Sequence, residues 1–300
     1  MNTVSPYITD TAFGRLHLKR YPDRSGQNLQ AWNAADLLLL DKAAELGIAP
    51  QHILLVNDEQ GALSTALPDA TLWTDSRLSL EAARRNRALN DCSTALRYSR
   101  SSEHPVGDYQ LVLLRIPKQL SLLHYQLKVL RECLSANTPV ISGGMDKHLP
   151  QGLADSLELH IGPTQRYRGQ RKARLFESRC VAALTPEFSF WREFHCSELG
   201  IDMRSAPNVF SGSQLDIGSR ALLAQMPRLP RANNIVDLGC GNGVLGLAAL
   251  QQMPDAAITF IDESDMALHS AKCNIALNAP ESVAHVQYLW CDGFEEYSED

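Results

Sequence analysis

The sequence has no apolar run long enough to cross a membrane. Its longest aliphatic run, Leu37–Leu40, is far shorter than the roughly 20 residues that a membrane-spanning helix needs. The first ten residues also lack the charged and then apolar segments of a secretory signal. We therefore expect no membrane partner. The ordinary composition, 44% hydrophobic and 21% charged, predicts a globular protein.

Cysteine and positive charge are limited as well. The seven cysteines are scattered with no C-x-x-C pair, which argues against a metal site or a disulfide framework and predicts a reduced, cytoplasmic location. The formal net charge of −6 argues against a generally basic nucleic-acid binder. Any contact with RNA must therefore use a local basic patch rather than the field of the whole protein.

The most informative stretch is Asn233–Ala249. Within it, Ile235–Leu238 is short, apolar and β-branched, which predicts a buried parallel strand. Three glycines at alternate positions follow, Gly239, Gly241 and Gly243, and an apolar helical pattern begins directly after them. Glycines at these positions let the backbone pass under a ligand beside a helix N-terminus. The stretch therefore predicts a nucleotide-type site.

Two ligands fit this turn. Gly241–Gly246 satisfies G-x-G-x-x-G, the dinucleotide fingerprint, and so allows an NAD-linked oxidoreductase. The stretch also matches D-x-G-x-G-x-G, the pattern of class I methyltransferases, whose cofactor is S-adenosylmethionine. Asp237 favours the second interpretation. A carboxylate about 4 Å from a pyrophosphate costs roughly 1–4 kcal/mol, whereas the sulfonium and amino groups of S-adenosylmethionine are both positive.

Two further acids follow predicted strands of the same sheet. Asp262, with Glu263 beside it, ends the strand predicted at Ile258–Ile261 and can accept hydrogen bonds from ribose hydroxyls. Asp292 follows a third predicted strand, Val286–Trp290, and is positioned to meet an adenine amino group. NAD sites use the same ribose contact, so Asp262 supports a nucleoside ligand without choosing between the two cofactors.

The first half of the chain repeats this layout. Asn57-Asp-Glu-Gln-Gly61 occupies the place of the glycine turn, and Leu72-Trp-Thr-Asp75 ends in an acid, as the strand before Asp262 does. Ala83–Asn90 shares five of eight residues with Ala271–Asn278. The offset between the copies is 182 residues at the turn, 187 at the acid and 188 at the helix. Such constant spacing predicts a duplicated domain.

Alternating strands and helices in the first copy predict a doubly wound α/β sheet. We expect strands at Ile53–Val56, Tyr109–Leu114 and Thr138–Ser142, a helix over Leu37–Leu46 that Gly47 ends, and a helix from about 120 to 134.

The predicted fold is therefore α/β, with two tandem class I methyltransferase-like (Rossmann-like) domains. Their expected bounds are 1–180 and 208–300, joined by a linker region at 181–207. The first domain is expected to be degenerate because side chains replace two of its glycines, and the second to be incomplete at Asp300.

Basic residues gather just before the predicted linker. Between residues 162 and 179, six bases accompany a single acid, Glu177. The functional interpretation is contact with an RNA backbone, and the structural alternative is a solvated strand or linker. Five of these bases are the predicted RNA-binding residues, namely Arg166, Arg168, Arg171, Lys172 and Arg174.

These pieces resemble the family of ribosomal RNA guanine-N2-methyltransferases over essentially all 300 residues. The resemblance is carried by Leu29-Gln-Ala-Trp-Asn-Ala-Ala-Asp36, Asn57-Asp-Glu-Gln-Gly-Ala-Leu-Ser64, Ile116-Pro-Lys118, Asn208-Val-Phe-Ser211, Leu215-Asp-Ile-Gly218, Ile235–Gly243 and Asp262-Glu-Ser264. It implies a degenerate first domain for RNA recognition and an active second domain. That second domain would use S-adenosylmethionine to methylate the N2 amine of a guanine in 23S ribosomal RNA. The expected enzyme is a cytoplasmic monomer without a metal.

The resemblance also implies which residues meet the cofactor. The predicted set is Asp237, Gly239, Cys240, Gly241, Asn242, Gly243, Asp262, Glu263 and Asp292. The loop before Leu215 departs from the family pattern at Gly212 and Gln214.

A second departure concerns catalysis. The family's catalytic Asn-Pro-Pro-Phe, expected after a fourth strand, does not occur before Asp300. We therefore assign no catalytic residue and expect the natural protein to continue for about 60–80 residues, within usual domain sizes. A non-catalytic RNA-binding fragment remains the other alternative.

Overall fold

The computed structural model describes residues 7–23, 29–181 and 189–293. The chain divides into two compact units, Met1–Glu187 and Phe188–Asp300. In both units parallel strands alternate with helices, which confirms the predicted α/β class. Within the described ranges, no helix is long and apolar enough to cross a bilayer.

The first unit contains one mixed sheet. Among the residues described there, its strands lie in the order β5 (Arg97–Arg100), β4 (Thr71–Thr74), β3 (Ile53–Val56), β6 (Leu111–Arg115), β7 (Pro139–Met145), β9 (Ala173–Arg179) and β8 (Thr164–Arg166). The strands from β5 to β7 pair in parallel, whereas β9 and β8 pair antiparallel. Chain direction across the sheet reverses between β3 and β6, which is the doubly wound arrangement.

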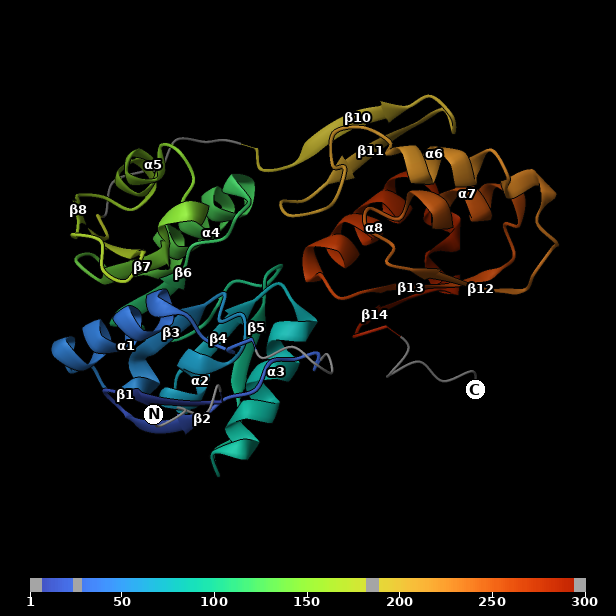
Figure 1. Cartoon of the computed structure of the whole chain (residues 1–300). Coiled ribbons are helices and arrows are strands. Elements are labelled where there is room, and N and C mark those ends of the chain that lie inside the picture. Colours follow the sequence, from blue (N-terminus) through green and yellow to red (C-terminus); the bar gives the residue numbers. More distant parts are fainter. Residues whose placement is uncertain (1–6, 24–28, 182–188, 294–300) are drawn as a thin grey trace. The chain divides into compact units, whose positions relative to one another are not determined.

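Helices cover both faces of this sheet. Figure 1 shows α1, α2 and α3 on one side of it and α4 and α5 on the other. The bounds are α1 (Ala34–Leu46), α2 (Ala62–Ala66), α3 (Arg77–Leu89), α4 (Leu120–Cys133) and α5 (Leu153–His160), with 3-10 turns η1 (Pro50–His52) and η2 (Asp146–His148). A two-stranded antiparallel ribbon, β1 (Ile8–Thr11) and β2 (Gly14–His17), precedes them.

Local sequence accounts for these elements. Every residue of β3 and β6 is buried, as their continuous aliphatic sequences require between two layers of helices. Helix α1 begins at a capping box, in which Asn33 Oδ1 accepts from Ala35 N–H and Asp36 Oδ2 accepts from Asn33 N–H. It ends at Gly47, which adopts a left-handed conformation with φ of 64°. The predicted helix end at Gly47 is confirmed.

The second unit is built on a parallel sheet. In its described part the strand order is β12 (Asn234–Leu238), β13 (Ala257–Asp262) and β14 (Val286–Trp290). Figure 1 shows α6 (Ile217–Leu223), α7 (Val244–Gln252) and α8 (Asp265–Asn278) on one face. The 3-10 turns are η3 (Met226–Arg228) and η4 (Pro280–His285). Strand β14 has the predicted bounds.

Strand β12 is parallel, as predicted, but it is not buried. Leu238 is 50% exposed, and Asp237 alone in this strand is buried. Among the described residues β12 pairs with β13 on one edge only, so its side chains lack the cover that a central strand receives.

The segment expected as a linker contains regular structure. Strands β10 (Arg192–Cys196) and β11 (Ile201–Ser205) form an antiparallel ribbon, while residues 182–188 lie outside the described ranges. Asn274 of α8 binds this ribbon: its side-chain carbonyl accepts from Arg204 N–H at 2.8 Å, and its amide donates to the Arg204 carbonyl at 2.7 Å. Residues 192–205 therefore belong to the second unit and are not a linker.

The first unit repeats this arrangement of hydrogen bonds. Asn86 of α3 accepts from Lys19 N–H at 2.8 Å and donates to the Lys19 carbonyl at 2.9 Å. Its amide also donates to the Gln60 carbonyl, just as Asn274 donates to the Asn242 carbonyl. These matching contacts support the duplication inferred from the sequence.

The strand pairing fixes how the two copies align. Leu55 of β3 pairs with Leu72 of β4, and Asp237 of β12 pairs with Phe260 of β13. The first strands therefore align at an offset of 182 residues and their partners at 188.

This alignment corrects the sequence prediction at the acid. With an offset of 188 residues, Thr74 rather than Asp75 is equivalent to Asp262. The bonds before the following helix agree, since Thr74 Oγ1 accepts from Ser76 N–H at 3.3 Å and Asp262 Oδ1 accepts from Ser264 N–H at 2.9 Å. The first unit thus has a hydroxyl where the second has a carboxylate.

A glycine with a left-handed backbone precedes α2, and the packing there generates a prediction. Gly61 has φ of 77°, and a Cβ at this position would lie 2.5 Å from Ala83 Cα. Gly61→Ala should therefore lower the free energy of unfolding of the first unit twice over. The left-handed alanine costs about 1–2 kcal/mol, and the overpacking costs about 1–3 kcal/mol.

Gly152 supplies the matched control. It has φ of 73°, and a Cβ there would meet no atom within 4 Å. Gly152→Ala should carry only the backbone cost, as measured by urea unfolding followed by circular dichroism. Equal losses of stability in the two variants would contradict the packing argument.

Candidate functional site

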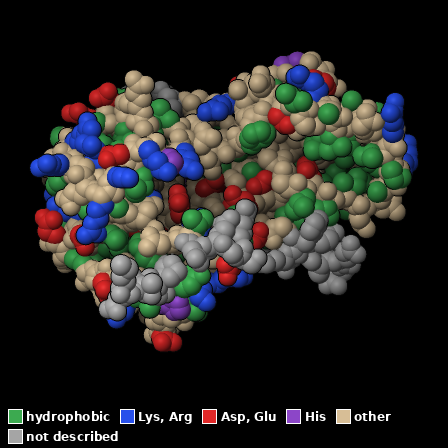
Figure 2. Space-filling model, viewed as in Figure 1, with side chains coloured by type: hydrophobic (Ala, Val, Ile, Leu, Met, Phe, Trp, Pro, Cys, Tyr) green, Lys and Arg blue, Asp and Glu red, His purple; other side chains and the backbone are tan. Residues whose placement is uncertain are grey.

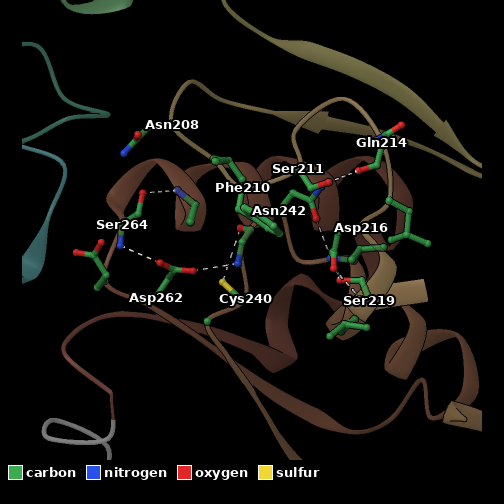
Figure 3. Close-up of a pocket in the computed structure, with 18 residues that line it drawn as sticks. Asn208, Phe210, Ser211, Gln214, Asp216, Ser219, Cys240, Asn242, Asp262 and Ser264 are labelled. Atoms are coloured by element: carbon green, nitrogen blue, oxygen red, sulfur yellow. Dashed lines mark hydrogen bonds between the residues drawn. The ribbon is translucent and has the colours of Figure 1, made fainter. Parts of the chain in front are cut away.

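A cavity of about 270 Å³ opens at the carboxyl ends of β12 and β13. The glycine turn after β12 forms one wall, and the others come from the end of β13, the start of α8 and the loop that leads to α6. Figure 3 shows side chains from these segments around the cavity, with Asp262 and Ser264 at one end and Asp216 and Ser219 at the other. Parallel α/β sheets bind ligands at this edge.

The turn after β12 presents backbone rather than side chains to the cavity. Gly239 and Gly241 have φ of 68° and 54°, and a Cβ on either would meet no atom within 4 Å. Gly243 has φ of 80°, but a Cβ there would lie 2.9 Å from Ala271 Cβ. Gly243 therefore allows α7 to pack closely on α8, whereas Gly239 and Gly241 leave room for a ligand against the backbone.

Asp262 ties the end of β13 to the glycine turn and to α8. Its Oδ2 accepts from Gly241 N–H at 3.0 Å, and its Oδ1 accepts from Ser264 N–H at 2.9 Å. The side chain is half-buried and lines the cavity. Each carboxylate oxygen has a second lone pair, so Asp262 can still accept a hydrogen bond from a ligand hydroxyl.

Asp237 lies beneath the turn rather than on the cavity wall. Its Oδ2 accepts from Gly246 N–H, in the first turn of α7, at 2.9 Å. Burial raises the pKa of Asp237 to about 6; the Gly246 bond opposes this rise and the nearby Asp262 adds to it. Two carboxylates close together repel, so a cationic ligand in the cavity would relieve the repulsion and a pyrophosphate would increase it.

Six of the nine predicted cofactor residues line the cavity, and three do not. The lining residues are Gly239, Cys240, Gly241, Asn242, Asp262 and Glu263. Those that do not line it are Asp237, Gly243 and Asp292. The pKa of the buried Cys240 thiol is raised well above its ordinary value, first by burial and then by the neighbouring carboxylates. The thiol therefore stays protonated at neutral pH and is a poor nucleophile.

The loop before α6 supplies lining residues that the sequence did not predict. Phe210, which is 80% exposed, borders the cavity together with Asn208, Ser211 and Gln214. Asp216 caps α6 by accepting from the Ser219 hydroxyl and from backbone amides, and these bonds, the hydroxyl's first, lower its pKa. The signal in the sequence was the polar loop leading into a capped helix, but its packing over the turn is a tertiary contact.

In the first unit, a side chain occupies the equivalent of this surface. Asn57 stands at the position of Gly239 and has φ of 60°. Its amide donates to the Arg115 carbonyl at 3.0 Å and to Gln126 Oε1 at 2.9 Å, across the ends of β6 and α4. A ligand could not pass against the backbone here as it could at Gly239.

The buried carboxylate of the first unit also comes from a different position. Leu55 stands where β12 has Asp237. Asp58, in the turn, instead accepts from Ser64 N–H at 2.7 Å and from the Ser64 hydroxyl at 2.8 Å. Ser64 is equivalent to Gly246, so both units satisfy the same helix amide, by carboxylates that belong to different positions of the sequence.

The predicted RNA-binding residues lie in the first unit, on β8, β9 and the turn between them. Arg166, Arg168, Arg171 and Lys172 are exposed, and Arg174 is half-buried with its Nε 3.0 Å from Asp146 Oδ1. Figure 2, viewed as Figure 1, shows Lys and Arg side chains gathered on the side of this unit that carries α5 and β8. Among the described residues no cluster of His, Cys, Asp and Glu is arranged to hold a metal.

The raised pKa of Asp237 predicts a pH-dependent effect on stability. Its folded pKa of about 6 exceeds the ordinary value of 3.8, so the folded state binds more protons between these values. Stability from this group is therefore present below about pH 4 and is lost as the pH rises through 6. Asp237→Asn should stabilise the ligand-free protein by up to about 3 kcal/mol at pH 8 and change little at pH 4.

This effect is measured by urea unfolding of both proteins at each pH. Asp255→Asn, which removes an exposed carboxylate from the same unit, is the matched control and should shift the midpoint little at either pH. A loss of stability in Asp237→Asn at pH 8 would contradict the assignment of a buried, costly charge.

Comparison with known proteins gives the same division of the chain. Residues 7–182 match the family described as the RLMG N-terminal domain, and residues 200–300 match the methyltransferase small domain. Ribosomal RNA large subunit methyltransferase G of Ectopseudomonas mendocina is 39% identical over 93% of this chain and 76% of its own length. The protein of that name from Vibrio vulnificus is 35% identical over 93% and 76%.

A solved structure has the same fold. It is a T. thermophilus 16S rRNA N2 methyltransferase in complex with AdoMet and guanosine. It is 20% identical, with a TM-score of 0.67 over 98% of this chain and 78% of its own. The matches to methyltransferases decide against the NAD-linked alternative. By its match to the RLMG N-terminal domain over most of its length and its identity to these relatives, the chain belongs to the ribosomal RNA large subunit methyltransferase G family.

Proposed function

We propose that the protein transfers a methyl group from S-adenosylmethionine to the exocyclic N2 amine of a guanine in 23S ribosomal RNA. The relatives' name specifies ribosomal RNA of the large subunit, and the structurally similar T. thermophilus protein is an N2 methyltransferase with AdoMet and guanosine bound. The observation that carries the cofactor assignment is the open backbone over Gly239 and Gly241, with the carboxylate of Asp262 at its rim.

The residues of the cavity fit this cofactor. Gly239 and Gly241 leave space for a ligand in contact with the backbone, and Asp262 offers lone pairs to ribose hydroxyls. Asp237 acts from beneath the turn, through its bond to Gly246 and through its charge, rather than by direct contact. Cys240, Asn242 and Glu263 form the remaining wall. We retain Gly243 as a packing residue and Asp292 as a proposed adenine contact beyond the end of β14.

Bound S-adenosylmethionine supplies a methyl group on a positively charged sulfur. The carboxylates of Asp237 and Asp262 give the cavity a negative potential that favours such a ligand. An exocyclic amine is a weak nucleophile, so the protein's main contribution is to align the base and exclude water. The target guanine must be unpaired or flipped out of a helix to reach the cavity.

The first unit is proposed to recognise RNA rather than the cofactor. Asn57 occupies the place of Gly239, and Thr74 occupies that of Asp262. The exposed bases of the β8–β9 turn, Arg166, Arg168, Arg171 and Lys172, are suited to contact phosphates, with Arg174 behind them.

Calorimetry should find one S-adenosylmethionine per chain and no binding of NAD. Asp262→Ala removes the ribose acceptor and a bond to the glycine turn, so it should weaken cofactor binding about tenfold or more. Asp255→Ala, at an exposed acid outside the cavity, is the control and should leave the affinity unchanged. Two cofactors per chain, or full affinity in folded Asp262→Ala, would refute this division of roles.

Methyl transfer itself is tested with the product of the natural gene. Purified 23S ribosomal RNA and assembled large subunits, each lacking the modification, are incubated with labelled S-adenosylmethionine. Nuclease digestion and mass spectrometry should then find a single N2-methylguanosine. Methylation at another base atom would overturn the proposed target group. Cofactor binding with no transfer to either substrate would instead favour the non-catalytic RNA-binding alternative.

A further inference from the structure

The first unit contains a larger cavity than the cofactor site of the second. It has a volume of about 450 Å³ and lies where the carboxyl ends of β3, β6 and β7 meet the start of α1. This is the place where chain direction across the sheet reverses, which is where open α/β sheets bind ligands. Asn57 closes the backbone path used in the second unit, so this cavity is a different site.

The cavity is lined by a buried cation that the surrounding protein does not saturate. Arg115, at the end of β6, has a side chain only 8% exposed, and its Nε lies 3.0 Å from Asp36 Oδ1. The guanidinium Nη1 has no hydrogen-bond partner in the described part of the chain. Burial raises the pKa of Asp36 to about 6 even though Arg115 opposes the rise, so the pair is incompletely compensated. A buried guanidinium with a free N–H is suited to an additional acceptor.

The walls and the mouth of the cavity differ in chemistry. Trp32, Ile116 and Leu149 provide apolar surface inside it, and Lys118 and Lys147 are exposed at its edge. An aromatic ring beside apolar side chains can stack on a nucleobase, while the lysines can meet a phosphate. A volume of this size is within the range of small-molecule sites. The combination is that of a nucleotide pocket.

The mouth of this cavity adjoins the basic turn between β8 and β9. Asp146, at the start of η2, donates its N–H to the Lys172 carbonyl at 2.8 Å, and its carboxylate accepts from Arg174 Nε at 3.0 Å. The next residue of η2 is Lys147, which lines the cavity. Positive charge is therefore continuous from the exposed turn to the pocket.

We propose that this cavity receives one unpaired nucleotide of an RNA strand that lies along the β8–β9 turn, with its base beside Trp32 and its phosphate at Lys118 and Lys147. The proposal rests on RNA recognition by the first unit and names the group that this unit recognises. The polar end of the cavity, where Arg115 Nη1 lacks a partner, donates a hydrogen bond to an acceptor on the base. The connected basic turn favours a nucleotide within a strand over a free one.

The test uses the whole chain and single-stranded RNA oligonucleotides that carry the fluorescent base 2-aminopurine at successive positions. Stacking beside an indole should quench the label at one position and leave the others bright. Trp32→Leu should remove this quenching and weaken binding about tenfold. The double variant Lys118→Ala/Lys147→Ala changes only exposed residues, so it is expected to fold, and it should also weaken binding about tenfold. Arg84→Ala removes the same kind of charge from α3, outside the cavity, and should change affinity less than twofold.

Each other outcome overturns the proposal in a recognisable way. RNA binding with no quenched position, or with full affinity in the double lysine variant, would show that the cavity is not used, while the methyl-transfer assay would still judge the proposed function. Binding of nucleoside monophosphates as tight as that of the RNA, with no competition between them, would assign the pocket to a free nucleotide. Loss of RNA binding in Arg168→Ala/Arg171→Ala but in neither cavity variant would confine recognition to the turn.

Discussion

The bond between the Asp237 carboxylate and the Gly246 amide is the constraint on which the cavity of the second unit depends. A helix leaves its first amides without partners, and here a strand carboxylate beneath the turn supplies one. The residues between strand and helix need no side-chain cap of their own, so Gly239 and Gly241 remain open to a ligand. The consequence is a buried charge, which shows in the raised pKa of Asp237.

The first unit satisfies the equivalent amide without leaving the backbone open. Asp58 binds Ser64 from within the turn, and Leu55 fills the strand position where the second unit has its acid. The asparagine that ties the third helix to the preceding ribbon is present in both units, as Asn86 and Asn274. The scaffold is therefore the same, while the residues that would face a cofactor have changed.

The two units also differ in the charge that surrounds their cavities. Around the glycine turn the charged groups are the carboxylates of Asp237 and Asp262, which suits a cationic ligand. In the first unit, Arg115, Lys118 and Lys147 line the cavity, which suits an anionic one. The net charge of −6 conceals this separation because it averages over both units. A cofactor and a nucleic acid can thus be recognised by two copies of one fold.

The sequence by itself determined the order of strands and helices, the glycine turn and the duplication, because periodicity and turn chemistry act between near neighbours. Only the tertiary structure decided that Thr74 rather than Asp75 matches Asp262, and that Asp237 lies under the turn. It also decided that residues 192–205 form a ribbon of the second unit. These features depend on contacts such as that of Asn274 with Arg204, 70 residues away, whose partners are chosen by packing and not by local pattern.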